Sequence, residues 1–73
     1  MEAYKERMID EYNELNKRIV KLDKFIAKID NGDAYTIDDT QYHLLVAQSY
    51  AMHTYSRILL LRMHDLGFDH FEA

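Results

Sequence analysis

Apolar side chains in the first half of the chain recur at alternating intervals of four and three residues. The series consists of Met8, Tyr12, Leu15, Ile19, Leu22, Ile26 and Ile29. This spacing keeps all of them on one side of an α-helix that packs against a neighbour along most of its length. It predicts a helix over about residues 2–30, which Asn31, Gly32 and Asp33 can end because Gly and Asn tolerate the left-handed conformation.

A second helix is expected over about residues 38–66, after a loop at about residues 31–37. Either Thr36 or Asp38 can cap its first turn, because a side-chain oxygen at this position accepts a hydrogen bond from a free backbone N–H. The carboxylates of Asp38 and Asp39 also suit the positive end of the helix dipole.

Two residues, Gly67 and Phe68, mark the end of the second helix. Gly67 fits the left-handed position just beyond a helix, and Phe68 fits the apolar position after it. We therefore expect a Schellman arrangement in which Phe68 packs back on Met63. The remaining tail either frays or docks through Phe68 and Phe71.

Two long helices joined by a short loop should fold back on each other as an antiparallel hairpin. The absence of proline and the presence of only two glycines favour such helices. We predict an all-α single domain spanning residues 1–73, without internal repeats. Residues facing each other should have numbers that sum to about seventy, which pairs Ile26 with Leu45, Leu22 with Gln48, Ile19 with Met52, Leu15 with Tyr55 and Met8 with Arg62.

The second helix has more apolar surface than one partner helix can cover. One stripe consists of Leu45, Met52, Leu59 and Leu66. A second consists of Leu44, Ala47, Ala51, Ile58 and Leu61, with Tyr50 and Leu60 widening the arc. A helix that is apolar over most of its circumference must be surrounded. We therefore expect the hairpin to assemble into a homo-oligomeric helical bundle, as a four-helix dimer or a larger ring.

Charge and composition exclude several classes of protein. A formal net charge of -4 argues against DNA or RNA as a partner, because binding to nucleic acid depends on cations that neutralise phosphates. The chain has no cysteine, and hence no disulfide framework or thiolate nucleophile. The first residues are charged, unlike a signal peptide. Polar side chains such as Gln48 and Arg57 interrupt the most apolar segment, so no membrane partner is expected.

No catalytic motif is present, and we expect no enzyme activity. The sequence lacks a glycine-rich phosphate loop, a GxSxG nucleophile elbow and an HExxH zinc motif. Asp10 and Glu14 share one helical face, but that face is polar, and paired carboxylates need burial to separate their pKa values. No metal or other cofactor is expected either, since no two histidines are spaced three or four apart among His43, His53, His64 and His70.

Basic residues in the first helix are segregated along one line. Lys17, Lys21, Lys24 and Lys28 form a continuous stripe, with Arg18 beside it. In a chain that is acidic overall, such a stripe can attract a phosphate-bearing ligand, particularly where symmetry-related helices add their fields. The alternative is the ordinary solvent-exposed face of an amphipathic helix.

Three polar residues, Gln48, Tyr55 and Arg62, interrupt the apolar second helix at intervals of seven. They should lie together at the margin of a buried seam. In a structural role, Arg62 pairs with Glu11 or Glu6, Tyr55 places its hydroxyl at the rim of the core, and Gln48 sets the register. In a binding role, the arginine contacts phosphate, the tyrosine stacks on a base, and the glutamine recognises a base edge.

The residues just described resemble a family of short phage-encoded proteins, relatives of a crAss-like phage gene product. The resemblance runs from about Tyr4 to Arg62 and is carried by "YKERMIDEYNEL", "RIVKL" and "LLVAQSYAMHTYSRILLLR". Within these segments the family pattern maps to Lys5-Glu6-Arg7-Met8, Glu14-Leu15, Leu44-Leu45, Gln48, Met52, Tyr55 and Arg62.

The hairpin is also similar in architecture to phage sponge proteins that sequester the nucleotide signals of bacterial CBASS and Thoeris defence. This resemblance implies an anti-defence protein in the host cytoplasm that binds a cyclic nucleotide or ADP-ribose derivative between protomers. With the basic stripe and the aligned polar trio, it gives a set of expected ligand-binding residues. They are Arg7, Lys21 and Arg62 for phosphates, Tyr12 and Tyr55 for stacking, and Gln48 for hydrogen bonding.

Two other functions fit the same sequence. A protein-protein inhibitor such as an acidic anti-CRISPR would need only exposed carboxylates, and the first turns of helix 2–30 supply Glu2, Glu6, Asp10, Glu11 and Glu14. A small structural oligomerisation module would need neither a ligand nor a target.

Overall fold

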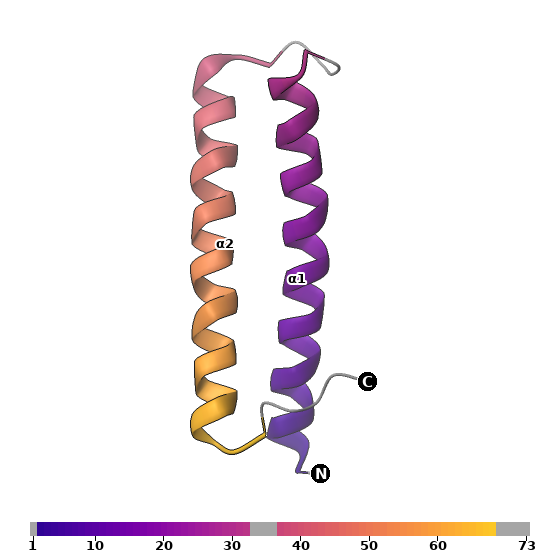
Figure 1. Cartoon of the computed structure of the whole chain (residues 1–73), viewed down its shortest axis with the longest axis vertical. Helices are drawn as coiled ribbons and strands as arrows, with labels where there is room; N and C mark the ends of the chain where they lie inside the picture. The colour runs from indigo at the N-terminus through magenta and orange to yellow at the C-terminus, as the bar shows by residue number, and fades with distance from the viewer. Residues whose placement is uncertain (1, 33–36, 69–73) are drawn as a thin grey trace.

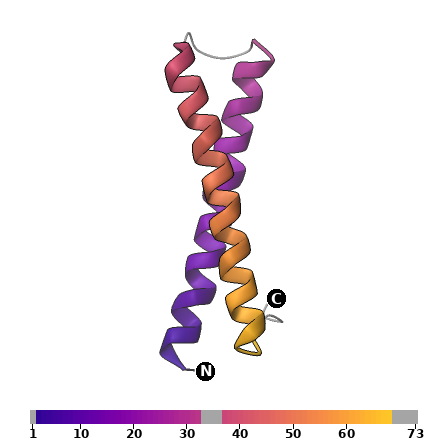
Figure 2. The ribbon, with the colours of Figure 1, turned by 90° about the vertical axis from the view of Figure 1, so that its left-hand side faces the viewer.

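The computed structural model describes residues 2–32 and 37–68. Helix α1 (Ala3–Asp30) and helix α2 (Asp39–Asp65) run antiparallel in an elongated molecule whose longest dimension is 46 Å (Figure 1). Viewed from the side, the helices cross near their middle and diverge toward both ends (Figure 2). The predicted all-α hairpin is confirmed, and each helix boundary differs from its predicted position by at most one residue.

A side-chain cap begins α2. Asp38 adopts an extended backbone conformation, and its Oδ1 accepts a hydrogen bond of 2.7 Å from the backbone N–H of Gln41. This bond satisfies one of the free donors of the first turn, and Asp39 adds negative charge beside it. The prediction of Asp38 as the cap is confirmed, while the other candidate, Thr36, lies outside the described residues.

Glycines in the left-handed conformation end both helices. Gly32 follows α1 with a φ of 75°, and Gly67 follows α2 with a φ of 82°. Beyond α2, the N–H of Phe68 donates to the carbonyl of Met63 at 3.0 Å, which is the predicted Schellman bond. Phe68 packs against the core, and the ring lies 5.3 Å from Nζ of Lys5. The candidate tail contact Phe71 and the loop residue Asp33 are outside the described residues.

The hydrophobic core is small and lies between the two helices. Its buried members are Met8, Leu15, Ile19, Leu59 and Met63. Leu59 and Met63 are fully buried. Because so few side chains are removed from water, the hairpin gains less from burial than a larger domain would.

The register differs slightly from the predicted one. Three hydrogen-bonded pairs across the hairpin have residue numbers that sum to 72, two more than expected: Asp30 with Tyr42, Asp23 with Ser49, and Asn16 with Ser56. α2 is also rotated relative to the predicted packing, so that Ser49 faces α1, where it is buried, and Gln48 is exposed. The predicted pairing of Leu22 with Gln48 is therefore wrong, because the hydrogen bond of Ser49 to Asp23 holds α2 in a different rotation.

The two apolar stripes of α2 have different environments. Leu59 is buried and Leu45 and Met52 are half-buried, but Leu66, the C-cap residue just beyond α2, is exposed. The second stripe is exposed, as predicted, with one exception. Leu60 packs against the core instead of widening the exposed arc.

Candidate functional site

Tyr55 lies at one edge of the contact between α1 and α2 and is 40% exposed. Its hydroxyl donates a hydrogen bond to Oε2 of Glu11. This bond raises the pKa of Tyr55 above its ordinary value of 10.0, as do partial burial and the negative charge of Glu11, whereas the positive charge of Arg62 lowers it. The pKa shift thus reports that Tyr55, Glu11 and Arg62 share one electrostatic environment.

Arg62 is exposed and forms no ion pair with any residue in the described part of the chain. The structural role considered for it was a salt bridge to Glu11 or Glu6, and neither is formed. Tyr55 takes Glu11 instead. The guanidinium is therefore available to an external anion.

Gln48 lies two turns before Tyr55 on the same edge of α2 and is exposed. Its Nε2 donates to Sδ of Met52 at 3.8 Å, a weak contact within α2. Because this contact does not reach α1, Gln48 does not set the register of the hairpin. Its amide can hydrogen-bond to a ligand.

Of the three expected ligand residues on α1, only Arg7 shares the helix face of Glu11, which it precedes by one turn. Tyr12 is half-buried and packs against the hydrophobic core, whereas Arg7 and Lys21 are exposed. Lys21 follows the buried Ile19 by two residues, which places it about 200° around the helix from the core. Tyr55 and Arg62 lie two turns apart on one edge of α2, and Lys21 lies away from them.

The basic stripe of α1 lies on the outer face of the hairpin. All four of its lysines are exposed: Lys17, Lys21, Lys24 and Lys28. Lys17 pairs with Glu14 at 3.4 Å within α1, and such exposed pairs contribute little to stability. The stripe therefore has the geometry of a solvated face and forms no pocket with α2.

The opposite edge of the hairpin carries a polar cluster around Asp23. Oδ1 of Asp23 accepts a hydrogen bond of 2.6 Å from Ser49, and Oδ2 lies 2.8 Å from Nε2 of His53. The bond from Ser49 and then the contact with His53 lower the pKa of Asp23 below its ordinary value of 3.8, against the smaller opposing effect of burial. Asp23 is therefore ionised at neutral pH and links α1 to two positions of α2.

Sequence reasoning missed this cluster. The sequence patterns assigned no role to Asp23 or to Ser49. The available signal was a carboxylate on the core side of an otherwise basic segment, because a charged group at such a position needs partners. A second polar pair, Ser56 donating to Asn16 at 2.8 Å, continues the same edge.

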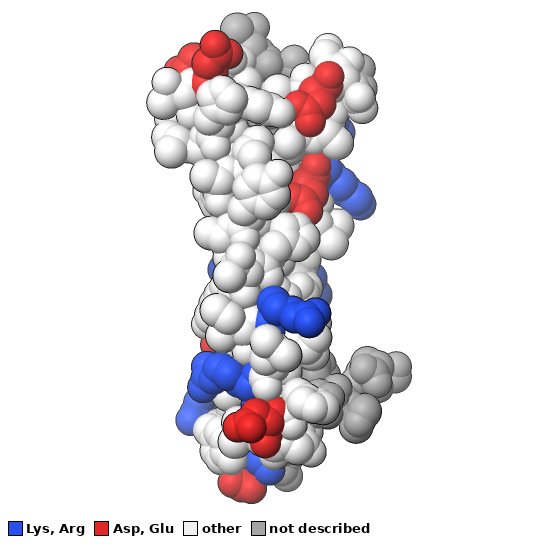
Figure 3. Space-filling view, turned by 60° about the vertical axis from the view of Figure 1, so that its left-hand side comes forward, with Lys and Arg blue, Asp and Glu red and all other residues white. Residues whose placement is uncertain are grey.

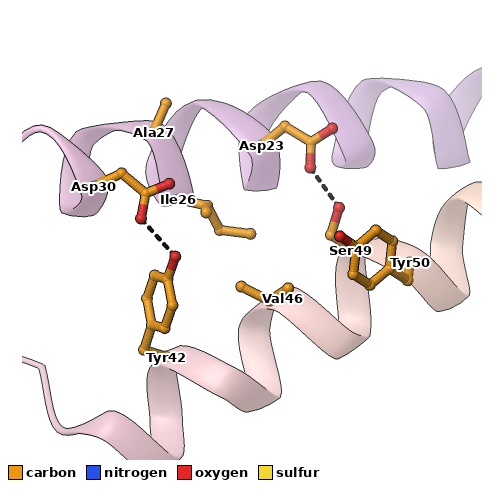
Figure 4. A pocket seen from close by; sticks show the side chains of 8 residues that line it. All are labelled: Asp23, Ile26, Ala27, Asp30, Tyr42, Val46, Ser49 and Tyr50. Atoms are coloured by element: carbon orange, nitrogen blue, oxygen red, sulfur yellow. Dashed lines mark hydrogen bonds between the residues drawn. The ribbon is translucent and has the colours of Figure 1, made fainter.

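A shallow pocket of about 340 Å³ opens beside this cluster, toward the loop end of the hairpin (Figure 4). Ile26 and Val46 form its apolar part, and Tyr42 donates to Oδ1 of Asp30 at 2.5 Å. This hydrogen bond raises the pKa of Tyr42 above 10.0. With the carboxylates of Asp23 and Asp30 in its wall, the pocket repels phosphate.

The outward face of α2 is apolar and uncharged over most of its length. Leu44, Ile58 and Leu61 are between 47% and 57% exposed, and Tyr50 is 71% exposed. Figure 3 shows uncharged side chains over much of the α2 side of the molecule. An exposed apolar surface of this kind marks an interaction site more often than an ordinary solvent face.

Two classes of site receive no support from the described residues. In residues 2–32 and 37–68, no three His, Cys, Asp or Glu side chains gather closely enough to hold a metal ion. Within the same ranges, neither helix combines the length and hydropathy needed to cross a bilayer.

Residues 2–65 match one known protein family, described as Sequestin. No curated protein and no solved structure shows significant similarity to the chain.

Proposed function

Because this chain belongs to the Sequestin family, whose name indicates a sequestering role, we propose that it sequesters a nucleotide immune signal at a site between protomers. The ligand is a cyclic nucleotide or an ADP-ribose derivative, bound without turnover. The protein acts as a phage anti-defence factor in the host cytoplasm. The observation that carries this proposal is the position of Arg62, an exposed guanidinium without an ion pair to any described residue, two turns from the partly exposed Tyr55 at the border of an uncharged surface.

The chemistry of this edge suits a nucleotide. A guanidinium binds phosphate oxygens through two parallel hydrogen bonds, and an aromatic ring offers a face on which a base can stack. Gln48 adds an amide that can both donate to and accept from a base edge. Tyr55 can rotate away from Glu11 or stack while keeping that bond, since its ring remains partly exposed.

The other edge of the hairpin is less suited to phosphate. Asp23 and Asp30 line the pocket there, and their negative charges oppose a phosphate group. Phosphate binding is therefore assigned to the edge of Arg62. Lys21 and Arg7 contribute to binding in one of two ways. Their positive charges attract the phosphate from a distance, or their side chains contact a ligand that is bound to another copy.

Binding without turnover agrees with the arrangement around Ser49, the hydroxyl closest to a histidine-carboxylate pair. Ser49 and His53 contact different oxygens of the same Asp23 carboxylate. In a nucleophilic triad the histidine instead lies between the serine and the carboxylate, so that it can take the serine proton. The order found here stabilises the carboxylate and does not activate the hydroxyl.

Calorimetric titration of the purified protein with cyclic dinucleotides, cyclic trinucleotides and cyclic ADP-ribose isomers tests the proposal. We expect heat of binding with at least one member of this panel, and its loss in Arg62→Ala. Arg57→Ala is the matched control, because Arg57 is the other exposed arginine of α2. Heat denaturation of the complex should release the nucleotide with unchanged mass. Absence of heat with every compound would rule the proposal out.

A second candidate function is inhibition of a basic host protein, such as a CRISPR effector, by the acidic first turns of α1. It is favoured by the exposure of Glu2, Glu6, Asp10, Glu11 and Glu14. Three of these carboxylates already have intramolecular partners, in Lys5, Tyr55 and Lys17, which reduces the free negative field. Recovery of one stoichiometric host protein in a pull-down, with no nucleotide released on denaturation, would favour this function over sequestration.

A further inference from the structure

Six exposed positions of α2 form a seam on the side that faces away from α1. They recur at intervals of three and four residues and carry no charge: Leu44, Ala47, Ala51, Thr54, Ile58 and Leu61. This is the spacing with which two helices pack knobs into holes. From Leu44 to Leu61 the seam is about 26 Å long, at a rise of about 1.5 Å per residue.

The absence of charge in the seam determines which surface can pack on it. α1 of the same copy already packs on the opposite side of α2, and the outer face of α1 carries the exposed lysine stripe. A charged face does not match an uncharged apolar seam, because each lysine buried there would lose its hydration. Within the described residues, the complementary surface is the seam itself on a second copy.

We propose that two copies of the chain pack α2 against α2 in antiparallel orientation along this seam, and that this contact completes the nucleotide site. The pairing places Leu44 against Leu61 of the second copy, Ala47 against Ile58 of the second copy, and Ala51 against Thr54 of the second copy. A small side chain then opposes a large one at Ala47 and Ile58, the two leucines form the end layers, and the small Ala51 and Thr54 let the helices approach closely at the centre. A parallel pairing would instead set Ala47 against Ala47 and leave that layer underfilled.

The antiparallel arrangement also explains the interval of seven in the polar trio. Gln48, Tyr55 and Arg62 each follow a seam position by one residue, namely Ala47, Thr54 and Leu61. Residues at this flank meet the same flank of the partner helix in an antiparallel pair. Tyr55 therefore lies beside Tyr55 of the second copy at the twofold axis, and Arg62 lies beside Gln48 of the second copy.

Each dimer accordingly contains two equivalent half-sites. That their ligand is a nucleotide rests on the proposed function. One copy supplies the arginine that binds phosphate, the other supplies the amide that recognises the base, and the two tyrosines stack between them. A single hairpin has no such half-site. The half-site therefore suits a nucleotide whose phosphate is bound by one copy and whose base is bound by the other.

The oligomeric state tests the seam without any ligand. Ile58→Glu places a charge in the middle of the seam, and sedimentation velocity should show a dissociation constant raised about 100-fold or more. Val20→Glu is the matched control, since Val20 is an aliphatic residue of α1 with 51% exposure, close to the 47% of Ile58. Circular dichroism should show both variants to be helical. A wild-type monomer at every concentration would overturn the proposal, and so would equal effects of the two substitutions.

Cross-linking tests the orientation. The chain contains no cysteine, so Ala47→Cys and Ile58→Cys can be prepared separately and mixed. A short bis-maleimide should link Ala47→Cys to Ile58→Cys in preference to linking either variant to itself. Efficient self-linking of Ala47→Cys would show a parallel pair and overturn the antiparallel assignment. If the dimer forms as described but no nucleotide of the panel binds, the seam stands and the proposed function fails.

Discussion

The two helices have similar lengths but opposite surfaces. Nearly half of the 28 residues of α1 are charged, and its apolar side chains are concentrated on the side that meets α2. α2 contains only four Asp, Glu, Lys or Arg residues, and it has apolar side chains on both its inner and its outer sides. α1 therefore presents a charged outer face to water, whereas α2 presents a second apolar surface, which is the one proposed to meet another copy.

The largest expected effect comes from truncating the inner side of α2. Leu59→Ala removes a fully buried side chain from a core with few others, and we expect it to lower the free energy of unfolding by about 2–5 kcal/mol. For so small a domain this is enough to unfold most of the protein. Urea denaturation followed by circular dichroism measures the change.

Leu61→Ala is the comparison on the outer side of the same helix. Leu61 is 52% exposed in the hairpin, so its truncation should leave the monomer stable and weaken the dimer. The concentration dependence of the urea midpoint should then decrease. Equal destabilisation by Leu59→Ala and Leu61→Ala at high dilution would contradict the division between an inner and an outer side.

Arg62→Ala and Lys21→Ala compare the two helices as sources of ligand contacts. A charge-assisted hydrogen bond is worth about 1.5–3 kcal/mol, so Arg62→Ala should weaken nucleotide binding by roughly tenfold to a hundredfold. Lys21 lies on the outer face of α1, and its loss should cost only a small factor that disappears at high salt. Calorimetry at two ionic strengths separates the two effects. If Lys21→Ala weakened binding more than Arg62→Ala, the ligand site would lie at the basic stripe instead.

Acid unfolding should depend on Asp23, which joins the helices at the edge opposite Arg62. Because the pKa of Asp23 is lowered in the folded state, the stability it contributes is fully present above its ordinary pKa of 3.8 and is lost as the pH falls through the lower folded value. Asp23→Asn should flatten this part of the stability profile, measured by urea midpoints from about pH 5 to about pH 2. Asp10→Asn, a change at an exposed carboxylate of α1, should leave the profile unchanged.

The smallest effect is spectroscopic. The pKa of Tyr55 lies above 10.0 chiefly because its hydroxyl donates to Glu11. Glu11→Gln removes the negative charge, and the pKa of Tyr55 should fall toward 10.0. A titration of the ¹³Cζ resonance of Tyr55 measures the shift, and an unchanged value would show that the bond does not persist in solution.

Local features were predicted well from the sequence because they depend on neighbouring residues. The cap at Asp38 and the Schellman bond beyond α2 follow from side-chain and glycine chemistry within one turn. The packing of α2 on α1 was less accurate, because two rotations of α2 both turn Leu45, Met52 and Leu59 toward α1 and differ in the polar residues beside them. The rotation found brings Ser49, instead of Gln48, toward α1.

The candidate site was predictable only in part. The interval of seven located Gln48, Tyr55 and Arg62 on one edge of α2, but it did not indicate which of them would contact α1. Tyr55 and not Arg62 is the partner of Glu11, since the phenol hydroxyl lies within reach of that carboxylate. The pocket beside Asp23 and Asp30 depends on side chains from both helices, so no pattern within one helix predicts it.

The central claim, that the site is shared between copies, is tested most directly by mixing two defective variants. Arg62→Ala and Gln48→Ala should each bind nucleotide weakly on their own. In a mixed dimer, Arg62 of the second variant lies beside Gln48 of the first, which restores one intact half-site. With random exchange of copies, about a quarter of all half-sites should regain wild-type affinity in a calorimetric titration. A mixture that binds no better than the two variants measured separately would contradict a shared site.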